Sequence, residues 1–195
     1  MQIGLFFGSF NPIHKGHEAI ARYMLQFFDE VWLVVSPQNP FKTNHQLAPV
    51  ELRLEWAKTV FANETLIKVS DVETHLPLPS FTHQTLEHLQ IAYPANTFSL
   101  IMGTDNLPKF YKWKNYKHII HQHQLYIYNR EAKSNYILLH QNIKYTHAPL
   151  INISATIIRE SSYTGQLPKN LIDASVVDSI KKHYSGNTPL DANIF

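Results

Sequence analysis

The sequence predicts an α/β protein whose parallel sheet is covered by helices on both faces. Short runs of β-branched and aromatic residues alternate along the chain with longer segments of helical periodicity. Such alternation favours parallel strands that are joined by crossover helices. At 195 residues the chain is long enough for one well-buried core of this kind and short for two independent domains.

The first three predicted elements form a βαβ unit. An apolar strand over Ile3–Phe7 is followed by a helix over Gly16–Phe28 and a second strand over Val31–Val35. Further helices are predicted from Pro49 to about Ala62, over Thr82–Ala92 and over a segment ending near Ile120. Further strands are predicted over Ile67–Val69, Phe98–Met102, Leu125–Tyr128, Tyr136–Leu139 and Ile143–His147. Because such folds bind ligands at the carboxyl ends of their strands, the loops after strands are the place to seek a site.

The C-terminal part of the chain is predicted to be helical. A helix starts at Ser154, and after a break around Gly165 an amphipathic helix continues to about Tyr184. We therefore expect a single domain over residues 1–185, with a small C-terminal helical portion from about residue 154. Residues 186–195 are expected to form a loose tail.

The composition excludes several classes of protein. Hydrophobic residues make up 44% of the chain and charged residues 16%, without the apolar run of roughly 20 residues that a membrane span needs. The absence of cysteine rules out disulfides, thiolate zinc sites and a cysteine nucleophile. The net charge of +2 is small for a nucleic-acid-binding protein, and the start of the chain lacks a secretory pattern. We expect a cytoplasmic protein without nucleic-acid or membrane partners, and a homo-oligomer stays open.

The segment after the first strand has the sequence GSFNPIHKGH, from Gly8 to His17. Glycine and proline shape a turn, and Gly16 allows close backbone approach where the next helix begins. A helix N-terminus favours anions, and His14 and His17 would lie on one face of its first turn, with Lys15 pointing elsewhere. The segment therefore predicts a phosphate-binding pocket that is neither a P-loop nor a dinucleotide fingerprint.

Two plainer interpretations of these histidines remain. One is a turn with incidental surface histidines, which is the commoner outcome for an isolated HxxH. The other is a metal pair, although zinc would need a third ligand and Glu18 points about a quarter turn away. A second histidine run, His118, His121 and His123, lies at a helix-to-strand junction without a matched acid or cysteine. We expect exposed histidines there rather than a metal site.

Two further motifs supply groups that nucleotides use. In NISATIIRE, Ser154 is a predicted N-cap, and together with Thr156 and Arg159 it can face phosphate oxygens. The plain alternative is a capped helix whose arginine pairs with Glu160. In MGTDNL, Asp105 follows a strand, where it can accept hydrogen bonds from ribose hydroxyls or cap the next helix.

GSFNPIHKGH resembles the (H/T)xGH motif of a nucleotidyltransferase superfamily, and GTDNLPKFYKW, SFTHQTL and NISATIIRE together resemble the bacterial nicotinate-nucleotide adenylyltransferases. The resemblance extends from Ile3 to about Tyr184, with four motifs in the family's order. It implies a Rossmann-like, doubly wound parallel sheet. It also implies transfer of AMP from ATP to nicotinate mononucleotide, which forms nicotinate adenine dinucleotide and pyrophosphate in NAD biosynthesis. Mg²⁺ is implied as a companion of ATP, bound mainly through phosphates, with no metal ligands from the protein.

The resemblance assigns site residues by the motif positions that they occupy. His17 would contact the α-phosphate, His14 would contact the β-phosphate and the leaving pyrophosphate, and Trp113 would stack on nicotinate. The catalytic residues that it implies are His14, His17 and Arg159. The implied ATP-binding residues are Gly8, Ser9, Phe10, His14, Gly16, His17, Gly103, Asp105, Ile153, Ser154, Thr156 and Arg159. The implied mononucleotide-binding residues are Lys42, Thr82, Thr85, Trp113 and Lys114.

Some positions depart from the commoner wording of the family. Asn11 replaces an acid, Lys114 stands where an aromatic residue is frequent, and NPFK, with Lys42, stands where NPPHK is usual. Asparagine can keep the hydrogen bonds of the turn. Arg53 is a further basic group by resemblance, or it pairs with Glu51 or caps its helix. Two rival functions stay open: a sister adenylyltransferase for nicotinamide mononucleotide or another phosphate-bearing acceptor, and a non-catalytic nucleotide sensor.

Overall fold

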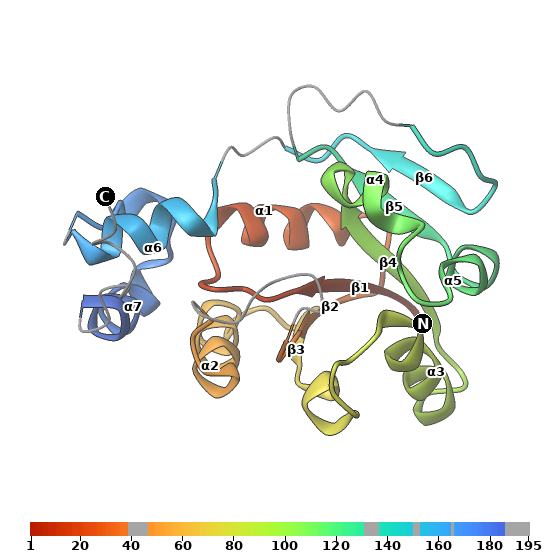
Figure 1. The fold of residues 1–195 in the computed structure, drawn as a ribbon, viewed down its shortest axis with the longest axis horizontal. Coiled ribbons are helices and arrows are strands. Elements are labelled where there is room, and N and C mark those ends of the chain that lie inside the picture. The colour runs from red at the N-terminus through yellow and green to blue at the C-terminus, as the bar shows by residue number, and fades with distance from the viewer. Residues whose placement is uncertain (39–46, 131–136, 150–152, 165, 186–195) are drawn as a thin grey trace.

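The computed structural model describes residues 1–38, 47–130, 137–149, 153–164 and 166–185. Within these ranges the centre is a sheet of six parallel strands in the order β3-β2-β1-β4-β5-β6 (Figure 1). The strands are β1 (Gln2–Gly8), β2 (Glu30–Val35), β3 (Ile67–Ser70), β4 (Thr97–Gly103), β5 (Leu125–Tyr128) and β6 (Ile143–Thr146). This topology confirms the predicted α/β class and its Rossmann-like, doubly wound sheet.

The strand order reverses beside β1. This strand pairs with β2 on one side and with β4 on the other, although β4 comes much later in the chain. At the carboxyl ends, Gly8 of β1 lies opposite Val35 of β2, and Gly103 of β4 lies opposite Tyr128 of β5. Open parallel sheets bind ligands at such a switch point. The loops after β1, β4 and β5 therefore reach one edge of the sheet.

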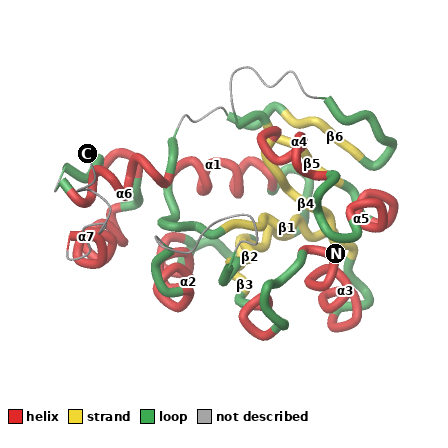
Figure 2. The backbone as a smooth tube through the Cα atoms, in the orientation of Figure 1, coloured by secondary structure: helices red, strands yellow, loops and turns green. Residues whose placement is uncertain are grey.

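Helices cover both faces of the sheet (Figure 2). Alternate strand residues point to opposite faces, so Leu33 of β2 packs in the core with α1 and α2, whereas Val34 packs with α3, α4 and α5. The helices are α1 (Lys15–Met24), α2 (Val50–Val60), α3 (Thr82–Ala92), α4 (Leu107–Phe110), α5 (Tyr116–Gln122), α6 (Ala155–Tyr163) and α7 (Val177–Ser185). Short 3₁₀ turns are η1 (Val72–His75), η2 (Thr104–Asn106), η3 (Lys169–Leu171) and η4 (Ala174–Val176). Among these helices, none is long and apolar enough to cross a membrane.

The C-terminal helices lie beside the start of α1 and beside α2 (Figure 1). The indole N–H of Trp56 in α2 donates to the Ser179 hydroxyl of α7 at 2.9 Å, and the rings of Tyr163 and Tyr184 pack edge to face between α6 and α7. The Tyr184 hydroxyl also donates to Asn11 in the loop after β1, so this portion meets the carboxyl edge of the sheet where β1 ends. The division into one domain over residues 1–185 stays a prediction, and the predicted tail lies outside the described residues.

One predicted strand is wrong over its described part. Residues 137–139 of the Tyr136–Leu139 prediction are not in a strand, and Ile137 and Leu139 are exposed. The backbone of Leu138 bonds instead to the Tyr145 hydroxyl, donating at 2.9 Å and accepting at 3.2 Å. Apolar residues favoured a strand there, but a side chain of β6 takes the hydrogen bonds that a neighbouring strand would have made.

Candidate active site

The loop between β1 and α1 is fixed by hydrogen bonds from distant parts of the chain. The Asn11 side-chain oxygen accepts from the Ala48 amide and from the Tyr184 hydroxyl, both at 2.9 Å. Phe10 has a positive φ of 45° and a fully buried ring, and a Cβ added to Gly8 would lie 2.9 Å from that ring. Glycine at position 8 is therefore required by packing, and Asn11 keeps the turn together as expected.

Arg53 fixes the same loop through hydrogen bonds to backbone carbonyls. Its buried guanidinium donates to the carbonyls of Ser9 at 2.6 Å, Ser36 at 2.8 Å, Ala48 at 2.9 Å and Pro37 at 3.1 Å. Arg53 thus connects the loop after β1 to the loop after β2. Neither predicted alternative, a pair with Glu51 or a helix cap, describes these bonds. Burial lowers the pKa of Arg53, but guanidinium stays protonated in proteins.

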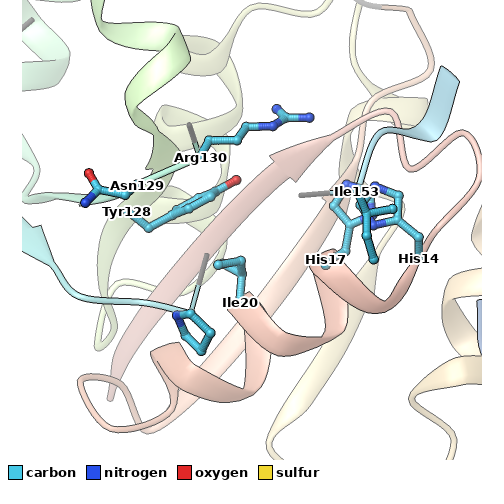
Figure 3. Close-up of a pocket in the computed structure, with 9 residues that line it drawn as sticks. His14, His17, Ile20, Tyr128, Asn129, Arg130 and Ile153 are labelled. Carbon is cyan, nitrogen blue, oxygen red and sulfur yellow. The ribbon is translucent and has the colours of Figure 1, made fainter. Parts of the chain in front are cut away.

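His14 and His17 come together at the first turn of α1 (Figure 3). Their ring centroids are 3.7 Å apart, with an interplanar angle of 23°. His14 is the N-cap residue, and its carbonyl accepts from the His17 amide at 2.8 Å. A Cβ on Gly16 would lie 3.0 Å from the His14 ring, so glycine leaves the room for this ring. The sequence expectation of two imidazoles on one face of the first turn is confirmed.

The buried ring of His14 is uncharged at neutral pH. Burial, together with the nearby positive charge of Arg130, lowers the pKa of His14 to about 3, although the residue's own backbone partly opposes the shift. Neither ring nitrogen has a hydrogen-bond partner among the described residues. A neutral imidazole has one N–H donor and one acceptor. A ligand that accepts a hydrogen bond, such as a phosphate oxygen, would satisfy the donor.

The start of α6 supplies a second group of donors near this turn. Ser154 is the N-cap of α6, and its hydroxyl accepts from the Thr156 amide at 3.2 Å, as predicted. Arg159 donates to the Asn11 carbonyl at 2.8 Å and to the Thr156 hydroxyl at 3.2 Å, so it does not use Glu160. Ile153 lies against the start of α1, 3.9 Å from the Cβ position of Gly16. Residues far apart in the chain therefore meet at one helix start.

Arg130, which sequence reasoning missed, completes the pocket. It follows β5, and its guanidinium donates to Asp105 after β4 at 3.1 Å. A Cβ on Gly103 would collide with the Asp105 carboxylate, which explains the glycine. Burial raises the pKa of Tyr128 to about 12, so its hydroxyl stays protonated. The pocket is lined by His14, Gly16, His17, Ile20, Tyr128, Asn129, Arg130, Pro149 and Ile153 (Figure 3).

The signal for Arg130 was present in the sequence but incomplete. A basic residue directly after an apolar strand stands at the sheet edge where ligands bind. Its relevance depends on β5 lying next to β4, which the sequence alone does not reveal. Asp105, expected to cap a helix or bind ribose, lies within η2 and pairs with Arg130 instead of capping.

The predicted acceptor residues lie around the starts of α3 and α5. The Lys114 ammonium lies 4.6 Å from the ring centre of Phe81, the residue just before Thr82. Trp113 is half-buried and packs edge to face on Phe110 at 5.5 Å, while its own amide donates to the Phe110 carbonyl. Its amide is therefore already used within a turn, and the flat indole is the part of Trp113 that is left to meet a ligand.

Thr85 lies deeper than expected. It is fully buried, and its hydroxyl donates to the buried Glu73 carboxylate at 2.9 Å, which also accepts from Ser80 at 3.0 Å. In this conformation Thr85 anchors α3 to η1 instead of facing the acceptor region. Lys42 lies outside the described residues.

The second histidine run is divided between surface and interior. His118 and His121 are exposed as expected, whereas His123 is half-buried and its Nδ1 lies 2.9 Å from the Phe98 carbonyl oxygen. The expectation of exposure is therefore wrong for His123, because its ring links α5 to β4. In the described parts of the chain, no three His, Cys, Asp or Glu side chains are placed to hold one metal ion.

The chain is similar in sequence to known proteins over most of its length. The chain matches the family described as Cytidylyltransferase-like over residues 5–161. A relative from Cytophaga hutchinsonii, named "Probable nicotinate-nucleotide adenylyltransferase", is 44% identical over 190 residues, which cover 95% of this chain and 99% of the relative. The chain belongs to the nicotinate-nucleotide adenylyltransferase family. It is therefore a nucleotidyltransferase, as the four motifs predicted. A relative of the same name from Bacteroides fragilis is 38% identical and covers 95% of this chain and 97% of its own length.

A solved structure shows that the family's fold extends to distant sequences. Nicotinic acid mononucleotide adenylyltransferase from Plasmodium falciparum, complexed with NaAD, matches with a TM-score of 0.74 at 19% identity. The match covers 93% of this chain and 95% of that one. At this identity the match supports the fold alone, and it agrees with the sheet order described above.

Proposed function

We propose that the protein transfers AMP from ATP to nicotinate mononucleotide, which forms nicotinate adenine dinucleotide and pyrophosphate in NAD biosynthesis. One observation carries the proposal: the start of α6 meets the start of α1, with Arg159 bonded to the Asn11 carbonyl at 2.8 Å. The first turn of α1 with its two imidazoles, and Arg130, line one small pocket, and the start of α6 with Arg159 lies beside the same loop. Such a set suits a chain of phosphates, because each group donates hydrogen bonds or positive charge.

The proposed reaction needs no protein nucleophile. A phosphate oxygen of the mononucleotide attacks the α-phosphorus of ATP, an O–P bond forms, and the bond to the β-phosphate oxygen breaks. The attacking oxygen is already ionised at neutral pH, so no strong base is required. Catalysis then depends on orientation and on stabilising developing charge. This requirement agrees with a pocket that contains donors and no carboxylate cluster.

His17 and His14 divide this work in the proposal. His17 donates to the α-phosphate, where charge develops, and the neutral His14 donates to the β-phosphate and the departing pyrophosphate. Ser154, Thr156 and Arg159 hold the other side of the triphosphate. The uncharged state of His14 supports a hydrogen-bonding role over a proton-transfer role.

The nucleoside of ATP would occupy the edge between β1 and β4. Gly103 leaves room for the Asp105 carboxylate, which would accept hydrogen bonds from the ribose hydroxyls. The backbone at Gly8, Ser9 and Phe10 contributes polar groups, since the Phe10 ring itself is buried. Ile153 and Gly16 complete the proposed ATP-binding set.

The acceptor would bind beside α3. Trp113 offers an indole face for the pyridine ring, and the start of α3 at Thr82 offers backbone N–H groups to the nicotinate carboxylate. Lys114 adds a positive charge near Phe81. Lys42 is kept as a proposed contact to the substrate phosphate, and Thr85 as a residue that shapes α3.

Mg²⁺ enters the proposal as part of MgATP. The pocket offers imidazole and guanidinium donors, which suit phosphate oxygens, whereas Mg²⁺ prefers oxygen ligands. The ion would supply charge neutralisation on the departing pyrophosphate while phosphates and water hold it. We further propose a cytoplasmic enzyme that acts on free nucleotides, without nucleic-acid or membrane partners.

The proposal is tested with purified protein, MgATP and a series of acceptors. Pyrophosphate release and product mass are measured with nicotinate mononucleotide, nicotinamide mononucleotide and phosphopantetheine. We expect release with nicotinate mononucleotide and a product of the dinucleotide mass. Preference for another acceptor would make the protein a sister transferase, and ATP binding without turnover on any acceptor would indicate a nucleotide sensor.

A further inference from the structure

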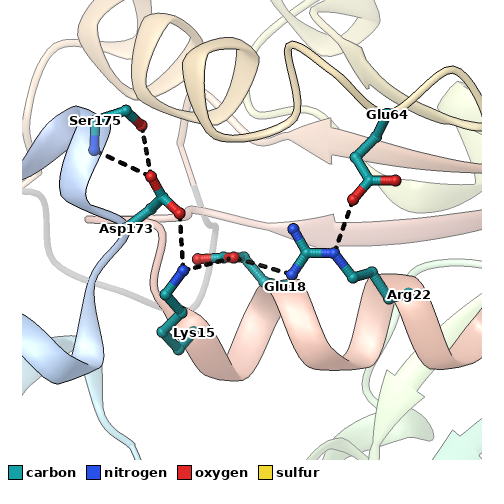
Figure 4. A network of polar contacts seen from close by, with 6 residues as sticks. All are labelled: Lys15, Glu18, Arg22, Glu64, Asp173 and Ser175. Atoms are coloured by element: carbon teal, nitrogen blue, oxygen red, sulfur yellow. Dashed lines mark hydrogen bonds and ion pairs between the residues drawn. The ribbon is translucent and has the colours of Figure 1, made fainter.

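Lys15, which separates the two histidines, is directed away from the phosphate pocket. Its ammonium donates to Asp173 at 2.8 Å and to Glu18 at 3.0 Å (Figure 4). Glu18 is fully buried and also accepts from Arg22 at 3.0 Å, and Arg22 in turn donates to Glu64 at 2.9 Å. The predicted direction of Lys15 is thus confirmed, and it has a specific partner 158 residues along the chain.

Asp173 connects this lysine to the C-terminal helices. One carboxylate oxygen accepts from the amide of Ser175 at 3.0 Å and from its hydroxyl at 2.7 Å, which caps η4. The other oxygen accepts from Lys15. Because η4 runs directly into α7, the start of α7 is tied to the start of α1.

The same C-terminal helices, α6 and α7, carry the second group of proposed phosphate donors, Ser154, Thr156 and Arg159. Tyr184 of α7 packs on Tyr163 of α6 with ring centroids 5.8 Å apart, and α6 carries Arg159. Tyr184 and Arg159 both bond to Asn11, to its side chain and its carbonyl respectively. A shift of α7 relative to α1 would therefore move Arg159 relative to the histidine rings.

We propose that Lys15 and Asp173 are positioning residues. They set the distance between the two groups that would hold the ATP phosphates, the histidine pair of α1 and Arg159 of α6. Their ion pair joins the helix that carries His14 and His17 to the helical unit that carries Arg159. Neither residue touches the nucleotide in this proposal. The inference rests on the proposed function only in taking ATP as the ligand of the pocket.

The pair is ionised under working conditions. Burial acts to lower the pKa of Lys15, but hydrogen bonds with Asp173 and Glu18 outweigh it and raise the pKa overall. The hydrogen bond from Lys15, followed by those from Ser175, lowers the pKa of Asp173 to about 2. The two side chains are partly exposed, at 38% and 30%, so the coupling is modest and sensitive to salt.

The test measures ATP binding by calorimetry and the KM of each substrate. Asp173→Asn keeps an oxygen that can cap η4 while it removes the charge that faces Lys15. Lys15→Met removes the ammonium, and Lys15→Arg preserves a cation that can reach Asp173. Asp178→Asn is the matched control, because it removes the same charge from an exposed position in the first turn of α7.

We expect Asp173→Asn and Lys15→Met each to weaken ATP binding about three- to tenfold, with the KM for nicotinate mononucleotide unchanged. The double variant should bind ATP no more weakly than either single variant, and Lys15→Arg should bind ATP about as tightly as the wild type. High salt should reduce the difference in ATP affinity between the wild type and the variants. If Asp173→Asn does not fold, Lys15→Met, which leaves the η4 cap intact, provides the measurement.

The proposal is overturned if Asp173→Asn binds ATP as tightly as Asp178→Asn does. It is also overturned if the KM values for ATP and for nicotinate mononucleotide rise equally, and rise most in the variants with the lowest free energy of unfolding. That result would indicate a purely structural contact. Calorimetry measures ATP affinity without an acceptor. Inactivity of the wild type on nicotinate mononucleotide would therefore refute the proposed function and remove the KM comparison, but it would leave the calorimetric test of this inference intact.

Discussion

The imidazole rings of His14 and His17 stack at 3.7 Å on the first turn of α1. Two imidazolium cations at this distance would repel each other, so the contact requires that at least one ring be neutral. Burial of His14 supplies that neutral ring. Because at least one ring is neutral, two N–H donors can lie side by side in the empty site without strong charge repulsion. Both donors are then placed to approach adjacent phosphates.

The low pKa of His14 predicts a loss of stability in mild acid. The unfolded chain takes up a proton on His14 near pH 6.5, whereas the folded protein does so only near pH 3. The stabilising contribution is therefore complete above pH 6.5 and is lost as the pH falls toward 3. Between pH 7 and 5 this loss amounts to about 2 kcal/mol. Urea unfolding at both pH values should show this loss in the wild type and a smaller one in His14→Gln; equal losses would contradict the shift.

Removal of the His17 ring should damage turnover more than folding. His17→Ala is expected to reduce kcat about 10²- to 10³-fold, because a donor to developing charge is lost. Circular dichroism and urea unfolding should stay near wild-type values. His88→Ala, at an exposed position of α3, is the control for loss of a histidine. A kcat for His17→Ala similar to that control would remove His17 from the mechanism.

Arg130 is expected to act on both ATP and His14. Arg130→Met keeps side-chain length but removes the charge that lowers the pKa of His14, so NMR titration should show this pKa rising. The affinity for ATP should fall about tenfold, because a cation facing the phosphate pocket is lost. Lys109→Met removes an equal charge from an exposed position of α4 and should change neither quantity. An unchanged pKa of His14 in Arg130→Met would show that the charge of Arg130 does not affect the His14 ring.

Local signals predicted the residues whose positions depend on a single turn. The positions of His14, His17 and Ser154 follow from a strand end, a helix start and an N-cap, each set by a few neighbouring residues. Arg130 was missed, and the bonds of Arg53 were not predicted, because their partners come from loops that the strand order brings together. The failed strand at residues 137–139 has the same origin, since pairing depends on what lies beside a segment.

Trp113 should control recognition of the acceptor and not of ATP. Trp113→Ala is expected to raise the KM for nicotinate mononucleotide about tenfold, the loss expected for one aromatic stack. Trp113→Phe should recover much of this loss, because a flat ring remains. The KM for ATP should stay within about twofold in both variants. An equal rise in both KM values after Trp113→Ala would point to collapse of α4 and α5, where Phe110 packs on the indole.

Arg53 should contribute to stability and to ATP binding through the loops that it joins. Arg53→Met fills similar space but leaves the carbonyls of Ser9, Ser36, Pro37 and Ala48 without this donor, so we expect a loss of about 3 kcal/mol in the free energy of unfolding. Lys58→Met, at an exposed position of the same helix, should cost less than about 0.5 kcal/mol. Urea unfolding compares the two variants directly. Because the Ser9 carbonyl belongs to the loop that leads into His14, Arg53→Met should also weaken ATP binding. Equal stability of the two variants would mean that water replaces the guanidinium at little cost and that Asn11 alone holds the loop.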